Sequence, residues 1–520
     1  MTDSIESIGN KCFFDLNALQ SIKISSQIKE IPISAFENCY ALSSITLPDS
    51  LEIINSFAFR NCISLTEIDI PEKVHNIYAN AFSGCTGIKR IGNKSPNFKL
   101  IKSILYQNNS LWISPKVISE PIEIDEDTEV IAQYSFSSSN ITTIHIPSKV
   151  RIIDTYAFAL TTLSNIAFSE GSDLTINPYA FTRSRLTEFH IPRRIITLMD
   201  GFLVQGNELY RFVVDEQSIH YSEINGTIYS KNKTHLVRCP PGYRDNKFLV
   251  PASISSIAQY AFGACINIRT IEFENSIITE IPGYCFAFCY SLRDFDIPFS
   301  VNTLRNCSFM NCTSLTYLRI HYNITDILGN PVIGCTNLTD IDVDENSTSF
   351  NYNSDFGYVL DKSNTTVYFG CPVCDAASFG LSVKKVMPFA FYRYEQLSIV
   401  FLNDDAEYIG DYAFYAPNVN YVIFCGDSIG EIGENAFGNH EIFVRQNNFV
   451  LSYGNYTTSR SMDTKCINVL SSVFTPRLSA LQTGLNVVLV YSIAVGAGIL
   501  ATTIFYCFWV KNGCKAKCLN

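Results

Sequence analysis

The stretch that decides the fold begins at Ile31 and ends at Ile91. It reads IPISAFENCYALSSITLPDSLEI, then INSFAFRNCISLTEIDIPEKVHN, then IYANAFSGCTGIKRI. Its Ala-Phe pairs and its cysteines Cys39, Cys62 and Cys85 both recur every 23 residues. A fixed period of this length predicts a solenoid, in which each coil buries its apolar side chains against the neighbouring coils.

Each unit of the repeat contains two short apolar runs. In the first run Ile45 and Leu47 alternate with polar residues, which predicts a half-buried strand. Pro48 ends that strand because proline cannot donate to a strand ladder. The second run, Leu51-x-x-Ile54, leads to the turn that carries Ala-Phe and Cys. We therefore expect a β-rich coil that stacks on the next at about 4.8 Å, the spacing of paired strands.

The composition limits the class of protein and its partners. The 520 residues are 47% hydrophobic and 17% charged, which is typical of a folded chain. The net charge of −11 offers no basic stripe to neutralise phosphates, so nucleic acid is not expected as a partner. No catalytic or metal-binding constellation emerges, and we expect no enzyme activity, metal or cofactor.

Three breaks interrupt the repeat, which otherwise continues to about residue 440. The first coil is imperfect, since Cys12-Phe13 replaces Ala-Phe, and it is expected to act as a cap. The breaks cover about 95–129, 213–250 and 344–383, and each reads as strand, polar turn and strand before an X-Pro pair. This pattern predicts β-hairpin inserts that project from one edge of the array.

The complete unit, Ala-Phe-x-x-Cys-x-x-Leu-x-x-Ile-x-Ile-Pro-x-x-Val-x-x-Ile, resembles the 23-residue leucine-rich repeat of the BspA-like surface proteins. These are known from mouth bacteria and expanded in parasitic protists. The resemblance covers about residues 8–439 and departs from the pattern at the first coil and at Val332. It implies an α/β, strand-dominated, right-handed leucine-rich-repeat solenoid with hairpin inserts over residues 1–440. It also implies a surface protein in adhesion or host-protein binding, in a family without shared catalytic residues.

A single transmembrane helix is expected after a cap or juxtamembrane stalk at 441–484. The uncharged run of 26 residues that begins at Leu485 and ends at Val510 exceeds the roughly 20 residues needed to cross a bilayer. The short basic tail at 511–520 carries three lysines, and positive residues beside a span tend to stay in the cytosol. We therefore expect a single-pass plasma-membrane protein with an extracellular solenoid.

The expected span and its flank carry motifs for helix pairing and for lipidation. Ala494-x-x-x-Gly498 and Ser492-x-x-x-Gly496 would allow weak self-association of the helix, although ordinary small residues in a lone span are the simpler interpretation. Cysteines near the end of a span are candidate lipidation sites. They are Cys507, Cys514 and Cys518.

The N-terminus argues against this topology. MTDSIESIGNKCFF has no apolar h-region, so no signal peptide is visible, and a lone span near the C-terminus also fits a tail-anchored cytosolic protein. Asn-x-Ser/Thr triplets favour the extracellular alternative because they are glycosylation acceptors. They begin at Asn108, Asn140, Asn225, Asn232, Asn323, Asn346, Asn364 and Asn455.

Cysteine and serine motifs have structural explanations. Cys371-Pro-Val-Cys374 predicts a local disulfide or two free thiols, because a zinc site needs a second ligand pair. Gly426-Asp-Ser-Ile-Gly430 matches a hydrolase elbow but lies on a repeat turn without the required helix. The cysteines at one repeat position predict a buried thiol ladder, with adjacent coils close enough for a bridge. They are Cys39, Cys62, Cys85, Cys265, Cys289, Cys312 and Cys335.

The outward side chains of the first-run strands form the sheet face, which is the candidate ligand-binding surface. Most are acidic, and the face becomes apolar at Phe401 and Ile423. A solvated face is the simpler interpretation. The alternative is that stacked carboxylates, which repel one another, recognise a basic protein patch or Ca²⁺. The candidates are Glu67, Asp69, Glu188, His190, Glu272, Asp294, Asp296, Tyr317, Arg319, Asp340 and Asp342.

These patterns favour a cell-surface repeat protein that binds protein or glycan ligands through an extended surface. The alternative is a tail-anchored cytosolic leucine-rich-repeat scaffold for intracellular proteins. Glycosylation of a residue such as Asn232 would exclude that alternative.

Overall fold

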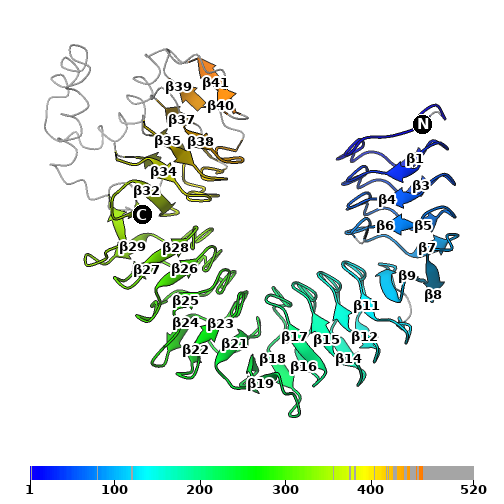
Figure 1. Ribbon diagram of the computed structural model, residues 1–520, viewed down its shortest axis with the longest axis horizontal. Helices are drawn as coiled ribbons and strands as arrows, with labels where there is room; N and C mark the ends of the chain where they lie inside the picture. Colours follow the sequence, from blue (N-terminus) through cyan, green and yellow to red (C-terminus); the bar gives the residue numbers. More distant parts are fainter. Residues whose placement is uncertain are drawn as a thin grey trace. The chain divides into compact units, whose positions relative to one another are not determined.

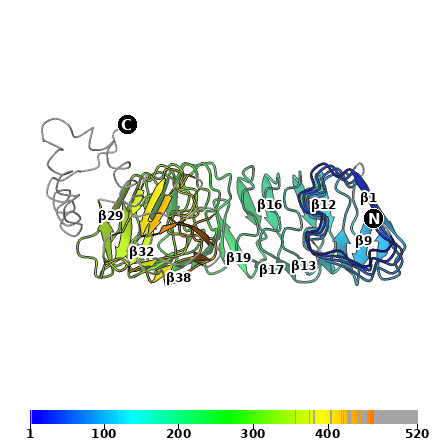
Figure 2. The ribbon, with the colours of Figure 1, turned by 90° about the horizontal axis from the view of Figure 1, so that it is seen from above.

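The computed structural model describes residues 1–438 with gaps at 2, 79, 119–120, 355–356, 374–375, 380–381, 403–404, 417, 420 and 425–429, and also 442–444, 452–453 and 456–460. The chain divides into two compact units, unit 1 (Met1–Ser314) and unit 2 (Leu315–Asn520). Within each unit, successive coils lie side by side (Figure 1). In Figure 2 the outlines of the first coils, in dark blue, nearly superpose.

Each regular coil contributes two short strands, one to each of two rows. In unit 1 the first row comprises β1 (Ser21–Lys23), β3 (Ser44–Thr46), β5 (Glu67–Ile70), β7 (Arg90–Asn93), β12 (Thr143–Ile146), β14 (Asn165–Phe168), β16 (Glu188–Ile191), β18 (Arg211–Val214), β22 (Lys247–Val250) and β24 (Thr270–Phe273). The second row comprises β2 (Glu30–Ile31), β4 (Ile53–Ile54), β6 (Asn76–Ile77), β11 (Val130–Ile131), β13 (Ile152–Ile153), β15 (Leu174–Ile176), β17 (Ile195–Leu198), β23 (Ser256–Ile257), β25 (Glu280–Ile281) and β26 (Thr303–Arg305).

Unit 2 repeats this arrangement. Its first row comprises β27 (Tyr317–Ile320), β29 (Asp340–Val343), β33 (Ala376–Ser378), β35 (Ile399–Leu402) and β37 (Tyr421–Phe424). Its second row comprises β28 (Asp326–Leu328), β34 (Lys385–Val386), β36 (Tyr408–Ile409) and β38 (Glu431–Ile432).

Paired coils are in parallel register with an offset close to the repeat length. In β5 and β7, Glu67 lies opposite Arg90 and Ile68 opposite Ile91. Along β5 the side chains alternate between exposed and buried, so that Ile68 faces the core and Asp69 faces solvent. The expected alternation of the first run is therefore confirmed in this strand.

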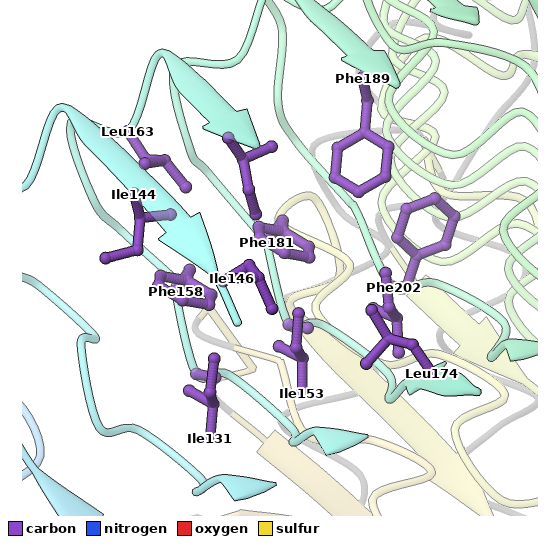
Figure 3. Close-up of a cluster of buried hydrophobic side chains, with 14 of the residues drawn as sticks. Ile131, Ile144, Ile146, Ile153, Phe158, Leu163, Leu174, Phe181, Phe189 and Phe202 are labelled. Carbon is purple, nitrogen blue, oxygen red and sulfur yellow. The ribbon is translucent and has the colours of Figure 1, made fainter. Parts of the chain in front are cut away.

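The phenylalanines of the Ala-Phe pairs stack through the core. Ring centroids are 5.0 Å apart for Phe136 and Phe158 and 5.3 Å apart for Phe158 and Phe181, with nearly parallel planes. Figure 3 shows the rings between isoleucines of the two rows, such as Ile144 and Ile153. Burial of each phenylalanine contributes about 1.5–3 kcal/mol, and each ring contact adds about 0.5–1.5 kcal/mol.

Left-handed backbone shapes the turn that carries each phenylalanine. Phe57 and Asn61 both have φ near 60°, which is unfavourable for residues other than glycine. Hydrogen bonds between coils hold this conformation: the N–H of Phe59 donates to Ala81 O at 2.8 Å, and Asn61 Nδ2 donates to Asn38 Oδ1 at 2.9 Å. The tight turn depends on stacking because its polar groups bond to the coils before and after it.

The three breaks are three-stranded antiparallel inserts, one strand more than the expected hairpins. They comprise β8 (Lys99–Ile101), β9 (Ile104–Gln107) and β10 (Ser110–Ile113); β19 (Tyr221–Ile224), β20 (Thr227–Ser230) and β21 (His235–Arg238); and β30 (Phe350–Asn353), β31 (Tyr358–Asp361) and β32 (Thr366–Gly370). The predicted hairpin strands are confirmed as the second and third strands. Their opposed residues include Tyr106 and Leu111, Tyr229 and Leu236, and Leu360 and Val367.

The inserts belong to the second row, and the expectation that they project from the array is wrong for their third strands. These strands pair in parallel with the next coil, β10 with β11, β21 with β23 and β32 with β34. The first insert also covers the preceding strand edge, because the indole N–H of Trp112 donates to Ile77 O at 2.8 Å.

Buried donors attach the first two inserts to neighbouring turns. Lys116 Nζ donates to Ser135 O at 2.7 Å, and burial lowers the pKa of Lys116 to about 7. The guanidinium of Arg238, 1% exposed, donates to carbonyl oxygens of Leu203, Tyr260 and Gly263. Arg238 is the donor to Leu203 O and Gly263 O, whereas Ser135 O also accepts from Ser114 and Tyr260 O also accepts from the N–H of Gly263.

The helical part of the expected α/β class is wrong for the residues that the structure describes, because none of them lies in an α-helix. The 23-residue coil returns through a second short strand and tight turns instead. No helix in this described part is long and apolar enough to cross a membrane. The expected span at 485–510 and the tail at 511–520 lie outside the described residues.

The repeat sheet extends past its expected end at residue 440. β39 (Ile442–Val444) pairs in parallel with β37, and β41 (Tyr456–Arg460) pairs in parallel with β39. β40 (Ser452–Tyr453) forms an antiparallel pair with β41. Part of the stretch that the sequence assigned to a cap or stalk therefore continues the sheet.

Candidate functional site

The sheet face of unit 1 carries ion pairs between coils. Arg90 Nε lies 3.0 Å from Glu67 Oε2, and its Nη1 and Nη2 donate to the two carboxylate oxygens of Asp69 at 2.8 and 3.0 Å. These carboxylates raise the pKa of Arg90. Gly92 leaves room for the pair, since a Cβ there would lie 1.9 Å from Asp69 Oδ1.

Glu188 and His190 belong to a second polar cluster on this face. Arg211 Nη2 lies 2.9 Å from the Glu188 carboxylate, and the hydroxyl of Tyr210 donates to the same group. The hydrogen bonds from Arg211 and Tyr210 lower the pKa of Glu188. His190 Nε2 is 3.7 Å from Glu188 Oε2. Two candidates are thus brought together by residues that the sequence did not single out.

The remaining candidates of unit 1 differ in their surroundings. Glu272 Oε1 lies 2.7 Å from Lys247 Nζ. Asp294 forms a backbone bridge with Thr270, and the side chains of Asp294 and Asp296 are exposed. In the described part of the chain neither of these aspartates takes part in an ion pair.

In unit 2 the candidates surround Arg319. Its Nε lies 3.5 Å from Asp342 Oδ2, and its Nη2 lies 3.2 Å from Asp344 Oδ2. The Tyr317 hydroxyl donates to Asp342 Oδ2 at 3.1 Å, and burial together with this bond raises the pKa of Tyr317. Asp340 lies opposite Tyr317 in the register and is exposed.

At several places a carboxylate on one coil lies next to a cation on the adjacent coil. The sequence predicted stacked carboxylates that repel one another, and this does not describe these oppositely charged pairs. The missed signal is the period itself, because opposite charges one repeat apart meet between adjacent coils. Pairs at this 23-residue spacing are Glu37 and Arg60, Glu67 and Arg90, Glu170 and Arg193, Glu188 and Arg211, and Lys384 and Glu407. Each exposed pair is worth about 0–1 kcal/mol.

A cavity of about 580 Å³ opens in unit 2 between the end of β29 and the third insert. The end of β29 and the loop after it contribute carboxylates, and the insert contributes amides, an ammonium group and a tyrosine. The polar lining includes Asp342, Asp344, Glu345, Asn351, Tyr352, Lys362 and Asn364. Of these, the sequence singled out only Asp342 for binding, because the insert closes against the sheet edge only in the folded chain.

Hydrogen bonds fix the insert side of this cavity. Asn351 Nδ2 donates to Asn364 Oδ1 at 2.9 Å and to Lys362 O at 3.2 Å. The Asp361 carboxylate accepts the N–H groups of Thr365 and Thr366 at 2.7 and 3.0 Å. The turn that presents Lys362 and Asn364 is therefore held in one conformation.

Five of the repeat cysteines are buried free thiols, as the sequence favoured: Cys39, Cys62, Cys85, Cys265 and Cys289. Cys312 and Cys335 are also buried. Each of several thiols donates to a carbonyl of an adjacent coil; Cys62 Sγ lies 3.2 Å from Phe36 O, and Cys85 Sγ lies 2.9 Å from Phe59 O. Burial raises the pKa of the Cys285 and Cys289 thiols. Cys371 is also buried, whereas Cys374 and the Gly426 motif fall among residues that are not described.

The predicted glycosylation acceptors that the structure describes are all exposed. They are Asn108, Asn140, Asn225, Asn232, Asn323, Asn346 and Asn364. Asn140 is already engaged, since its carboxamide exchanges hydrogen bonds with the backbone N–H and C=O of Ile118. Asn455 and the lipidation candidates Cys507, Cys514 and Cys518 lie outside the described residues.

Among the described residues, no group of three or more His, Cys, Asp or Glu side chains is placed to hold a metal ion. The site consists of a polar sheet face and one polar cavity.

The paired rows, the phenylalanine ladder and the 23-residue register define a strand-dominated solenoid of the leucine-rich-repeat type. The family described as "BspA type Leucine rich repeat region (6 copies)" matches residues 1–112, 117–232, 245–359 and 355–444. The chain belongs to this family. A search of curated proteins finds no match.

Solved structures of bacterial repeat proteins are similar to this chain. A leucine-rich cell surface protein from Faecalibacterium prausnitzii is 23% identical, with 62% of this chain and 87% of that chain covered and a TM-score of 0.40. The pneumococcal vaccine antigen PcpA is 16% identical, with 85% and 84% covered and a TM-score of 0.41. A leucine-rich-repeat protein from Eubacterium ventriosum is 18% identical, with 84% and 93% covered and a TM-score of 0.38.

Proposed function

We propose that this chain is a non-enzymatic cell-surface protein that binds a protein or glycan ligand through its repeat surface. A membrane span at 485–510 would anchor it, with the solenoid outside and the tail in the cytosol. Exposed residues on the sheet face carry the proposal. Leu249 is 53% exposed beside charged neighbours, and Tyr317 is 38% exposed above Asp342. Tyrosine and apolar side chains among charged residues are the groups that bind protein surfaces.

The sheet face suits recognition of an extended ligand because parallel register repeats its side chains at fixed spacing. A ligand that follows the rows would meet several coils at once, and many weak contacts would add up. The exposed aspartates Asp294, Asp296 and Asp340 are the first carboxylates to test, because Glu67 and Glu188 already have cationic partners.

The location is tested by protease treatment of intact cells that express a tagged protein, together with a glycosidase mobility shift. We expect loss of the solenoid without permeabilisation, and a shift that Asn232→Gln reduces. The matched control is Asn140→Gln, whose carboxamide is occupied by Ile118 and which should leave the shift unchanged.

The buried thiols favour a second candidate, the tail-anchored cytosolic scaffold. Cys39, Cys62 and Cys85 lie on adjacent coils and are free, and free thiols at such a spacing are typical of reducing compartments. Full protection from protease with no glycosidase shift would establish this alternative and overturn the surface location.

Ligand binding is tested separately on the purified chain. Once a protein ligand is found by screening, Asp294→Ala and Asp340→Ala should weaken its binding by about tenfold if carboxylates are at the interface. Unchanged binding of both variants would remove the sheet face from the proposal.

A further inference from the structure

We infer that the cavity in unit 2 is a binding site for one or two rings of a neutral, hydroxyl-rich sugar. The inference deepens the proposed function, because it names a ligand class and a place for it. The cavity of about 580 Å³ has the size of a small-ligand site.

The lining offers both donors and acceptors, which matches the chemistry of sugar hydroxyls. The carboxylates of Asp342, Asp344 and Glu345 accept hydrogen bonds, whereas the Lys362 ammonium donates. Asn364 uses its Oδ1 to accept from Asn351, and among the described residues no group accepts a hydrogen bond from its amide hydrogens. A hydroxyl group can satisfy either kind of partner, since it both donates and accepts.

The charge balance of the lining disfavours a cationic ligand. Arg319 contacts Asp342 at 3.5 Å and Asp344 at 3.2 Å, so two of the three carboxylates already have a counter-charge. Lys362 adds a second positive charge to the lining, which also contains the third carboxylate, Glu345. A lysine or arginine side chain of a protein would also leave the amide and ammonium donors without acceptors.

An aromatic ring and a rigid turn on the insert side of the cavity also favour a sugar ligand. Tyr352 contributes a ring to the lining, and the apolar face of a sugar can pack on such a ring. The Asp361 turn and the bonds of Asn351 hold the insert side before any ligand arrives. Binding would therefore require little ordering of the protein.

The second insert provides a natural comparison because its backbone follows the same path. Lys231 and Lys362 are equivalent, since the N–H of Lys231 donates to His220 O and that of Lys362 to Ser349 O, both at 2.9 Å. At the positions of Asn351, Tyr352 and Asn364 the second insert has Ser222, Glu223 and Lys233. The combination of amides and a ring belongs to the third insert.

The test is saturation-transfer difference NMR on the full-length chain, produced in a host that does not glycosylate Asn364. The probes are methyl α-mannoside, lactose and N,N′-diacetylchitobiose, each at about 10 mM, with acetyl-lysine amide as the cationic probe. We expect a signal from at least one sugar and none from the lysine probe. Lys362→Ala and Tyr352→Leu should each weaken binding by about tenfold, whereas Lys231→Ala should leave it unchanged.

Several outcomes would overturn the inference. They are the absence of a signal from all three sugars, a signal only from the lysine probe, and equal losses in Lys362→Ala and Lys231→Ala. Thermal unfolding of each variant separates loss of binding from loss of folding. The experiment uses purified protein, so its failure is distinguishable from failure of the proposed surface location, which is tested on cells.

Discussion

Phenylalanine and cysteine occupy neighbouring positions in the turn, and each stabilises the coil in a different way. The phenylalanine fills the interior and stacks on the next ring, as Phe36 does on Phe59 at 5.4 Å. The cysteine is small enough for the crowded turn and donates to the phenylalanine carbonyl of the preceding coil, as Cys62 does to Phe36. A thiol in this position must stay protonated, because a buried thiolate would lose both solvation and its donor hydrogen.

We expect the stability of the protein to fall as pH rises from about 8.5 to 9.5. Burial raises the folded-state pKa of Cys239, Cys285 and Cys289, whereas unfolded thiols titrate near 8.5. Their contribution is complete below the unfolded pKa and is lost as pH rises towards the folded pKa, by at most about 1.4 kcal/mol per pH unit for each thiol.

Denaturant unfolding of the reduced protein at several pH values measures this dependence. Cys289→Ala should make the free energy of unfolding fall less steeply with pH, because one buried thiol no longer contributes. Cys12→Ala, at an exposed position, should not change this pH dependence. Equal slopes for Cys289→Ala and the unmodified chain would contradict the explanation.

The inserts show how an element can interrupt a solenoid without exposing its core. A regular coil satisfies the next turn with backbone N–H groups, as Phe59 does for Ala81. Where an insert takes the place of a regular coil, long side chains supply further donors, as Lys116 does beside the N–H of Ser114 after the first insert and Arg238 does after the second. Among the described residues neither side chain has a carboxylate partner, and carbonyl oxygens accept the hydrogen bonds of both.

Arg238→Met should destabilise unit 1 by about 3 kcal/mol or more, because the buried carbonyl groups of Leu203 and Gly263 would lose their donor while the volume stays similar. Arg244→Met is the matched control, since Arg244 is exposed and only covers the Tyr210 ring at 4.0 Å. Its expected cost is about 0.5–1 kcal/mol.

Chemical denaturation of both variants measures the difference. A loss below that of Arg244→Met would show that water or a backbone shift satisfies the carbonyl groups in place of Arg238.

At the scale of the whole molecule, stability is the sum of coil-to-coil contacts rather than the property of one central core. Each coil touches only its neighbours, so a solenoid unfolds in blocks. The two compact units, Met1–Ser314 and Leu315–Asn520, are the natural candidates for such blocks.

Calorimetry should therefore show two unfolding transitions that respond to different substitutions. Phe59→Ala, in a stack of unit 1, and Phe391→Ala, in a stack of unit 2, should each cost about 3–5 kcal/mol. Each should lower one transition and leave the other in place. A single transition that both substitutions lower would mean that the chain unfolds as one cooperative block.

The sequence by itself determined the repeat, its strands and much of its core. The 23-residue period specifies which residues meet, because parallel coils in register bring equal repeat positions together, as with Ile68 and Ile91. It also predicted two of the three strands of each insert, such as those that contain Tyr106 and Leu111. The thiol ladder follows in the same way, since a small apolar residue at a fixed position must stack on its equivalents.

The tertiary structure alone decided what the sheet face and the inserts present. Glu67 belongs to the predicted acidic surface, but its charge is matched by Arg90, and pairing depends on both side chains reaching across the strands. The cavity joins Asp342 from a repeat strand to Lys362 from an insert. Its shape depends on how a three-stranded insert closes against the sheet, which is a long-range packing result that no local pattern or period encodes.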